Sequence, residues 1–326
     1  MPRVNLASMP ENPLHSDSTT AASASAASAP DEAAAPASSS PAASPSPNAR
    51  RGLALSPSRA GDYRQCPLKY RFRAIDKLPE PSTVAQVKGT LVHAVLEDMH
   101  ARPREERSYP AAVKQLKPTW RRMLDDDADG ELARLVPEES LLDFLVECRG
   151  LLKGYFIMEN PTGFDAAEIE KFVQMTLGVD SGAGAGGGVP VRGFIDRVDV
   201  APTGQVRIVD YKTGKKPHPR FQDEALFQMR FYALVWWRLT GHVPEQLRLM
   251  YLKVADDLTH SPTAGELERF EGELADLWAA IVRDGEFGDF RPKKSKLCGW
   301  CYFQELCPAF GGTPPEYPGW PGAHGE

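Results

Sequence analysis

The sequence lacks the features of an exported or membrane-embedded protein. It has no run of about 18 consecutive apolar residues. Its first residues also lack a basic start followed by an unbroken apolar stretch, as a secretory signal would have. We therefore expect a cytoplasmic protein without a membrane span. A G-x4-G-K-[ST] phosphate loop is also missing, so the chain shows no nucleotide-driven motor of its own.

An excess of positive charge is lacking as well. The chain has 38 Lys and Arg against 44 Asp and Glu, a formal net charge of -6 at pH 7. This balance argues against a protein that coats nucleic acid by bulk electrostatics. Basic residues do cluster within 64–77, 212–220 and 291–296. If these clusters meet in the fold, they form a groove for a polyanion, and otherwise they are scattered solubilising charge.

Aromatic and branched apolar residues are almost absent from the first fifty residues. Tracts such as TTAASASAASAP cannot bury enough apolar surface to offset the entropy lost on ordering. We predict a disordered tail over residues 1–50, a folded domain over 51–312 and a flexible C-terminal tail over 313–326. The overall content of 42% apolar residues is enough for a sizeable core.

Cysteine is scarce, and its distribution is uneven. Of the five cysteines, Cys298, Cys301 and Cys307 form a C-x2-C-x5-C group, while Cys66 lies far upstream. Four thiolates can complete a zinc site or a [4Fe-4S] cluster. Zinc fingers usually have two close pairs of ligands, so three clustered ligands and one remote ligand favour a [4Fe-4S] staple. Cys148 lies in an apolar helical pattern and is expected to be a buried apolar residue.

Apolar residues recur with helical spacing in several segments. Ser56 or Ser58 is expected to cap a short helix that ends at Cys66. Ser82 is expected to cap the next helix, on which His93 lies. Two further helices form an insertion at about residues 103–160, and Gly241 ends another. The longer helical segments are 82–102, 109–126, 138–158, 223–241 and 264–284.

The apolar period changes to two after the helical insertion. Residues 168–177, 189–200 and 205–212 read as three strands of an antiparallel meander, with a Gly-rich loop after the first. A fourth strand is expected over 246–254. Helices and strands in this order predict an α/β fold.

Acidic residues and a lysine lie near the ends of the second and third strands. Asp210 and Lys212 point to the same face of the third strand, because side chains alternate, while Tyr211 points away. Asp196 on the second strand can reach that face. Two close carboxylates repel unless a cation lies between them, and hard oxygen ligands suit Mg²⁺ or Mn²⁺. A lysine there could orient or help to deprotonate water, or stabilise a phosphate, so the pattern indicates a site for phosphodiester hydrolysis.

These strands resemble those of the PD-(D/E)XK nucleases and, among them, the RecB-like exonucleases. GFIDRVD looks like the strand with the metal-binding Asp, here Asp196, although Ile195 stands where the family name expects Pro. IVDYKTG looks like the D-x-K strand with its acid at Asp210 and its base at Lys212. The resemblance further implies that the backbone carbonyl of Tyr211 binds metal.

Other motifs extend the resemblance. GTLVHAVLE is similar to the family's upstream helix, whose His, here His93, joins the metal ligands. A lone His on an apolar helix is otherwise most often a core residue. QMRFY resembles the Q-x3-Y motif, which makes Gln228 and Tyr232 DNA contacts or supports of the ligands, unless they only fill the core. On the first strand Glu168 and Glu170 share a face, and we favour Glu170 as the catalytic acid.

The cysteine pattern is similar to the iron-sulfur staple of AddB-type nucleases and CRISPR-associated exonucleases. With it, the resemblance covers residues 53–310 and implies a restriction-endonuclease-like core, a mixed sheet flanked by helices. It also implies an exonuclease that digests single-stranded DNA in repair or recombination, with a separate helicase as a partner. A non-catalytic iron-sulfur module that binds nucleic acid, or an iron-sulfur electron carrier, are the alternatives. Neither would need Asp196, Asp210 and Lys212 together.

Overall fold

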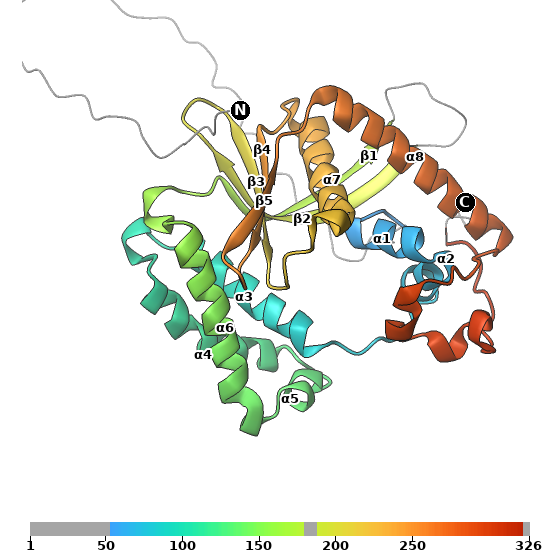
Figure 1. Cartoon of the computed structure of the whole chain (residues 1–326), viewed down its shortest axis with the longest axis horizontal. Helices are drawn as coiled ribbons and strands as arrows, with labels where there is room; N and C mark the ends of the chain where they lie inside the picture. The colour runs from blue at the N-terminus through green and yellow to red at the C-terminus, as the bar shows by residue number, and fades with distance from the viewer. Residues whose placement is uncertain (1–52, 179–187, 322–326) are drawn as a thin grey trace, which may run out of the picture. The chain divides into compact units, whose positions relative to one another are not determined.

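The computed structural model describes residues 53–178 and 188–321, with the side chain of Phe221 left out. The tail predicted over residues 1–50 and the Gly-rich residues 179–187 lie outside the described residues. A single five-stranded sheet, in the order β1-β2-β3-β4-β5, lies between two groups of helices (Figure 1). Within the described residues, no helix is both long and apolar enough to cross a membrane.

The sheet confirms the predicted meander and adds a strand to it. The strands β1, β2 and β3 pair antiparallel, and β4 pairs parallel with β3. The strand β5, which pairs antiparallel with β4, was not predicted. Its sequence DDLTH is polar and carries no apolar alternation, because it forms an edge of the sheet. The strands are β1 (Glu168–Leu177), β2 (Val189–Val200), β3 (Val206–Lys212), β4 (Gln246–Tyr251) and β5 (Asp256–His260).

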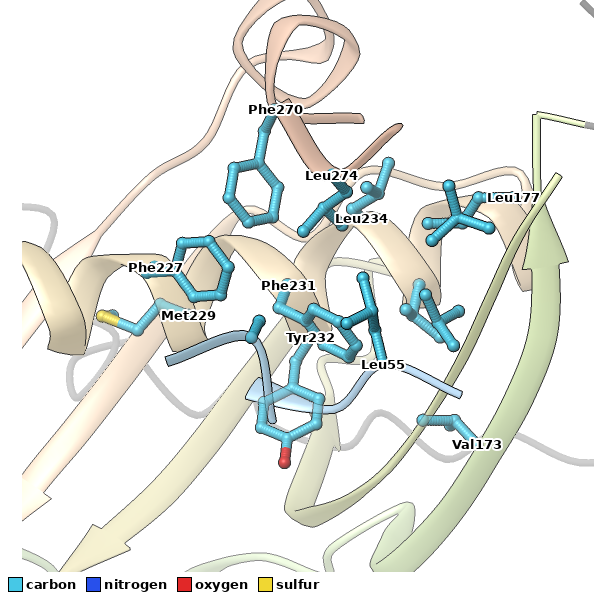
Figure 2. Packing of buried hydrophobic residues seen from close by; sticks show 14 of the residues in the cluster. Leu55, Val173, Leu177, Phe227, Met229, Phe231, Tyr232, Leu234, Phe270 and Leu274 are labelled. Carbon is cyan, nitrogen blue, oxygen red and sulfur yellow. The ribbon is translucent and has the colours of Figure 1, made fainter. Parts of the chain in front are cut away.

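One face of the sheet is covered by α7 (Asp223–Thr240) and α8 (Ala264–Phe287). The helix α7 provides the crossover that a parallel pair of strands requires, and it ends at Gly241, with a φ of 77°, as predicted. Figure 2 shows the packing between these helices and β1. Its labelled apolar contacts include Phe227, Phe231, Leu234, Phe270, Leu274, Val173 and Leu177.

The first described residues, up to the π-helical turn, pack on the same side. The helix α1 (Pro57–Gln65) is capped by Ser56, whose hydroxyl accepts a hydrogen bond from the backbone N–H of Arg59, so Ser56 and not Ser58 is the cap. Cys66 ends this helix, as predicted. The short helix α2 (Pro67–Tyr70) and a π-helical turn follow it.

The other face of the sheet is covered by α3 and the helical insertion. Thr83, rather than the predicted Ser82, caps α3, because Thr83 and Gln86 satisfy each other's backbone N–H groups in a capping box. Cys148 is fully buried among these helices, as expected, and burial raises the pKa of its thiol to about 12. The helices are α3 (Val84–His100), α4 (Tyr109–Asp125), α5 (Glu131–Leu135) and α6 (Glu138–Met158).

The segment after residue 312, for which a flexible tail is predicted, contacts α8 in the part that the structure describes. The hydroxyl of Tyr317 donates a hydrogen bond to the carbonyl of Gly285 on α8 at 2.7 Å. Trp320 packs against Trp278, with ring centroids 6.3 Å apart. Burial of these aromatic rings offsets the entropy of ordering a segment that is otherwise rich in Pro and Gly.

Two glycines of α6 provide a test of how closely this helix packs against the sheet. A Cβ on Gly154 would lie 1.8 Å from the carbonyl oxygen of Leu252, whereas a Cβ on Gly150 meets no heavy atom within 4 Å outside its own helix. We expect Gly154→Ala to lower the free energy of unfolding by about 1–3 kcal/mol through overpacking. Gly150→Ala should raise it by roughly 0.5–1 kcal/mol through helix propensity. Urea unfolding measures both, and equal effects would contradict the described contact of α6 with the sheet.

Candidate active site

The end of β3 lies beside the middle of β2, and this brings two of the predicted residues into direct contact. The backbone N–H of Tyr211 donates a hydrogen bond to Oδ2 of Asp196 at 2.7 Å. The side chain of Tyr211 lies in the apolar cluster of α3 and α6. Asp210 and Lys212 point to the other face, as strand alternation predicts.

The helix α3 places the imidazole of His93 against this pair of strands. Its Nε2 lies 2.9 Å from the carbonyl oxygen of Tyr211, and because a carbonyl only accepts, Nε2 carries the proton. The other nitrogen, Nδ1, lies 3.5 Å from Oδ2 of Asp196 and 3.9 Å from Oε1 of Glu170. Burial lowers the pKa of His93, although the charge of Asp210 opposes the shift. A neutral His93 therefore presents a lone pair to the two acids.

Glu170 completes a group of three ligand atoms. The nitrogen of His93 and the carboxylate oxygens of Glu170 and Asp196 all lie within 4.8 Å of one another. Glu170 has a φ of 45°, a strained value for a residue with a side chain. Glu168, the other acid considered, forms an ion pair with Lys171 at 2.8 Å instead. The structure thus places the favoured glutamate in the site and the other one outside the group.

The electrostatics of these acids fit a divalent cation. Burial raises the pKa of Glu170 to about 7, and the charges of Glu97 and Asp210 add to the shift. Burial and the charge of Asp210 also raise the pKa of Asp196 well above its usual value. The carboxylates are therefore unfavourable as anions unless positive charge lies between them. One imidazole nitrogen and two carboxylates form a donor set that suits Mg²⁺ or Mn²⁺.

Asp210, Lys212 and Gln228 form a closed set of contacts beside the three ligand atoms. Lys212 Nζ lies 2.7 Å from both Asp210 Oδ2 and Gln228 Oε1. The amide nitrogen of Gln228 donates to Asp210 Oδ1 at 2.7 Å. Burial alone would lower the pKa of Lys212, but Asp210 raises it above the usual value. Lys212 is therefore protonated and can donate, but not accept, a proton.

The predicted metal ligands are together, but their arrangement differs from the one expected. Asp210 faces Lys212 and Gln228 and is not among the three closest ligand atoms. The carbonyl of Tyr211 accepts a hydrogen bond from His93. Glu170, which was expected to serve catalysis, contributes one of the three close ligand atoms. The structure therefore groups His93, Glu170 and Asp196, with Asp210 and Lys212 next to them.

Tyr232 lies in the core, between the apolar residues of α7 and the acids of the site. Its hydroxyl points away from the apolar residues around it in Figure 2. Burial, with the charges of Asp210 and Asp196, raises the pKa of this hydroxyl. The ring lies against Gly193, where a Cβ would be 2.8 Å from Tyr232 Cε1. A glycine before the FID motif is therefore needed for α7 to approach β2.

Sequence reasoning missed a buried arginine behind the site. Arg197, next to Asp196 on β2, is fully buried and forms ion pairs with Glu159 and Asp199. Its Nη1 also donates a hydrogen bond to the hydroxyl of Tyr211 at 2.7 Å. The network thus holds Tyr211, whose backbone carbonyl contacts His93 and whose backbone N–H contacts Asp196. The sequence DRVD places Arg197 two residues from Asp199, which could have indicated an ion pair between them. The second partner, Glu159, is remote in the chain and left no local signal.

The four predicted cysteine ligands line one pocket between the end of α1 and the segment after α8. Two backbone N–H groups point at sulfur atoms: that of Lys293 at Cys66, 3.4 Å away, and that of Ser295 at Cys298, 3.3 Å away. No three of these sulfur atoms, all of which the structure describes, lie within 4.8 Å of one another. Two of the basic clusters meet here, because Lys69, Lys293 and Lys294 line the same pocket.

Comparisons with known proteins give distant relatives. The chain is 27% identical over 190 residues to the Gene 69 protein of Mycobacterium phage D29, across 51% of this chain and 65% of that protein. A solved structure of a candidate exonuclease from Eubacterium rectale has a TM-score of 0.49 and 11% identity, covering 76% of this chain and 86% of that one. The structure of SSO0001 has a TM-score of 0.35 and 14% identity, covering 69% and 97%. Both structural likenesses are too distant to indicate function.

A family model gives a firmer result. The model of the PD-(D/E)XK nuclease superfamily, whose members use divalent metals, matches residues 54–308. That range includes every site residue described above and all four pocket cysteines. The mixed five-stranded sheet flanked by helices is consistent with the restriction-endonuclease-like core expected from the sequence. The chain belongs to the PD-(D/E)XK nuclease superfamily.

Proposed function

We propose that this protein is a RecB-like, metal-dependent exonuclease that hydrolyses phosphodiester bonds of single-stranded DNA. The observation that carries the proposal is the convergence of His93, Glu170 and Asp196 within 4.8 Å, next to a protonated Lys212. Membership of the nuclease superfamily supports phosphodiester hydrolysis. The preference for ends and single strands rests on the resemblance of the motifs to those of RecB-like exonucleases.

The acids and His93 would bind the divalent cation. A bound Mg²⁺ or Mn²⁺ would supply the positive charge that makes water a stronger acid and stabilises charge on a phosphate. His93 offers Nδ1, and Glu170 and Asp196 offer carboxylate oxygens. The N–H of Tyr211 fixes the carboxylate of Asp196. We also propose ligand roles for Asp210 and for the carbonyl of Tyr211, which would have to release its hydrogen bond from Nε2 of His93 to bind the ion.

Lys212 acts as a fixed cation rather than as a base. Because it stays protonated, it can orient a water molecule or donate to a phosphate oxygen whose charge increases in the transition state. Gln228 contacts both Lys212 and Asp210 and holds them in position. Tyr232 keeps α7, which bears Gln228, against β2.

The four cysteines hold a [4Fe-4S] cluster in this proposal. Zinc fingers usually have two close pairs of cysteines, whereas this chain has three clustered cysteines and one remote one, which favours a [4Fe-4S] cluster over zinc. The two N–H donors and the nearby lysines compensate for the negative charge of four thiolates. The cluster would serve as a staple between the two ends of the folded chain.

The biological setting follows from the same resemblance. We propose a cytoplasmic role in DNA repair or recombination, together with a separate helicase that supplies unwound strands. Cysteines that serve as metal ligands rather than in disulfides are typical of a reducing compartment. A non-catalytic iron-sulfur module is the alternative, but such a module would not need buried acids next to Lys212.

The proposed activity is tested with single strands labelled at the 5′ or the 3′ end, using anaerobically purified protein and Mg²⁺ or Mn²⁺. An exonuclease releases short products from one end, whereas an endonuclease releases internal fragments. Glu170→Gln should lower the rate by about 100-fold or more, because it removes a charged ligand. Glu168→Gln is the matched control and should cleave normally. Intact strands in every metal would reject the nuclease assignment, and equal rates of the two variants would reject the role of Glu170.

Lys212 offers a second test in the same assay. Lys212→Met removes the charge but keeps the length, and we expect a loss of about 100-fold or more in kcat. Lys216→Met is the control, since Lys216 pairs with Asp256 at 2.7 Å and with the carbonyl of Asp257, both on β5 and not in the site. Circular dichroism checks that both variants fold. A folded Lys212→Met protein with the wild-type rate would show that the amine has no catalytic role.

The metal group at the cysteines has its own signature. Anaerobically purified protein should absorb at about 400 nm and contain iron and sulfide. Cys301→Ala should lose this absorbance and lower the melting temperature, while Cys148→Ala should keep the absorbance, because Cys148 lies buried away from the pocket. Stoichiometric zinc without the absorbance band would contradict the cluster.

A further inference from the structure

A pair of exposed aromatic rings lies on the strands that carry two of the site acids. Phe172 of β1 and Phe194 of β2 are directly opposite each other in the antiparallel register. Their ring centroids are 5.1 Å apart, and the residues are 49% and 54% exposed. The site assigned above makes no use of either ring. Two adjacent half-exposed phenylalanines form an exposed apolar patch, and such patches mark binding surfaces.

The neighbours of these rings show which face of the sheet they occupy. Val173 and Ile195 are buried in the core on the α7 side. Position 193 also faces α7, because a Cβ there would meet Tyr232. By strand alternation, Phe172 and Phe194 point to the opposite face. That face is the one on which α3 packs and from which His93 reaches the acids.

The ring pair is the next layer of side chains after the acid pair. Phe194 precedes Asp196 by two residues, and Phe172 follows Glu170 by two residues. Two residues of a strand span about 6.6 Å. This span is comparable to the separation of successive phosphates in an extended nucleic acid strand. A base next to a phosphate held at the acids would therefore reach the rings.

A positive charge lies one layer further along the same strands. Arg192 precedes Phe194 by two residues and is opposite the exposed Gln174. Among the residues that the structure describes, no carboxylate forms an ion pair with Arg192. Arg59 lies close to it: burial, and then the charge of Arg192, lower the pKa of Arg59. Two neighbouring cations attract an anion such as a phosphate.

We propose that the Phe172–Phe194 pair stacks the nucleobase next to the phosphate that is cleaved, and that Arg192 binds the phosphate beyond that base. The inference rests on the proposed function for the identity of the ligand as a nuclease substrate. Stacking on an aromatic ring tolerates any base, because every base has a π-face. A base inside a duplex is covered by its neighbours and cannot stack in this way. The platform thus gives a physical reason for a preference for single strands.

Binding in the presence of Ca²⁺, in place of the catalytic cation, tests the platform without cleavage. The double variant Phe172→Leu/Phe194→Leu should bind a labelled single strand roughly 5- to 100-fold more weakly in fluorescence anisotropy. The matched control is Phe287→Leu, which alters a 78% exposed ring at the end of α8 and should bind normally. Because the two platform rings are exposed, the double variant should fold, as circular dichroism will check.

Abasic substrates separate stacking from a general loss of contact. Replacing one nucleotide at a time by an abasic unit should weaken binding to the wild type at one position, and the double variant should show no further loss there. Arg192→Gln should reduce the slope of log Kd against log salt by about one, as expected for a lost phosphate contact.

Two results would overturn the platform. One is equal affinity of the double variant and the wild type. The other is the same abasic sensitivity in both proteins. In the first case, sedimentation shows what the rings do instead. If the wild type self-associates and the double variant does not, the rings form a protein interface and the proposal is wrong. A wild type that binds with the predicted pattern but never shortens a strand would support the platform and contradict the nuclease function instead.

Discussion

Repulsion between the carboxylates of Asp196, which is buried, and Glu170, which is partly buried, is the constraint on which this site depends. Glu170 and Asp196 both have pKa values raised by burial, and the charge of Asp210 adds to each shift. The fold nevertheless brings them together, with a strained backbone at Glu170 and a backbone N–H donor at Asp196. Such an arrangement is costly unless a cation compensates for it. The neutral nitrogen of His93 that faces both acids gives that cation a third ligand.

Tyr211 links the two halves of the fold at the site. Its side chain is buried in the cluster of α3 and α6, where its hydroxyl accepts a hydrogen bond from Arg197. Its peptide meanwhile holds His93 through the carbonyl and Asp196 through the N–H. From the other face of the sheet, α7 contributes Gln228. The geometry of the metal ligands therefore depends on packing on both sides of the sheet. A change in the core on either side should shift the positions of the ligand atoms.

The sequence was informative where a short-range rule applied. Strand alternation placed Asp210 and Lys212 on one face, and the helical pattern around His93 gave its element. Local competition and long-range contacts were harder to predict. The cap at Thr83 depends on a reciprocal contact with Gln86 that Ser82 cannot make, and the edge strand β5 has no apolar pattern. The burial of Arg197 depends on partners far away in the chain, and no local pattern reports such contacts.

The central claim is that His93 and the acids share one divalent ion. Pulsed electron paramagnetic resonance of the protein with one equivalent of Mn²⁺ tests it directly, because the bound ion reports nitrogen nuclei in its coordination sphere. The account predicts a coupling to one imidazole nitrogen that is present in the wild type and absent in a folded His93→Gln protein. A Mn²⁺ signal without nitrogen coupling, or a coupling that is unchanged in His93→Gln, would contradict it.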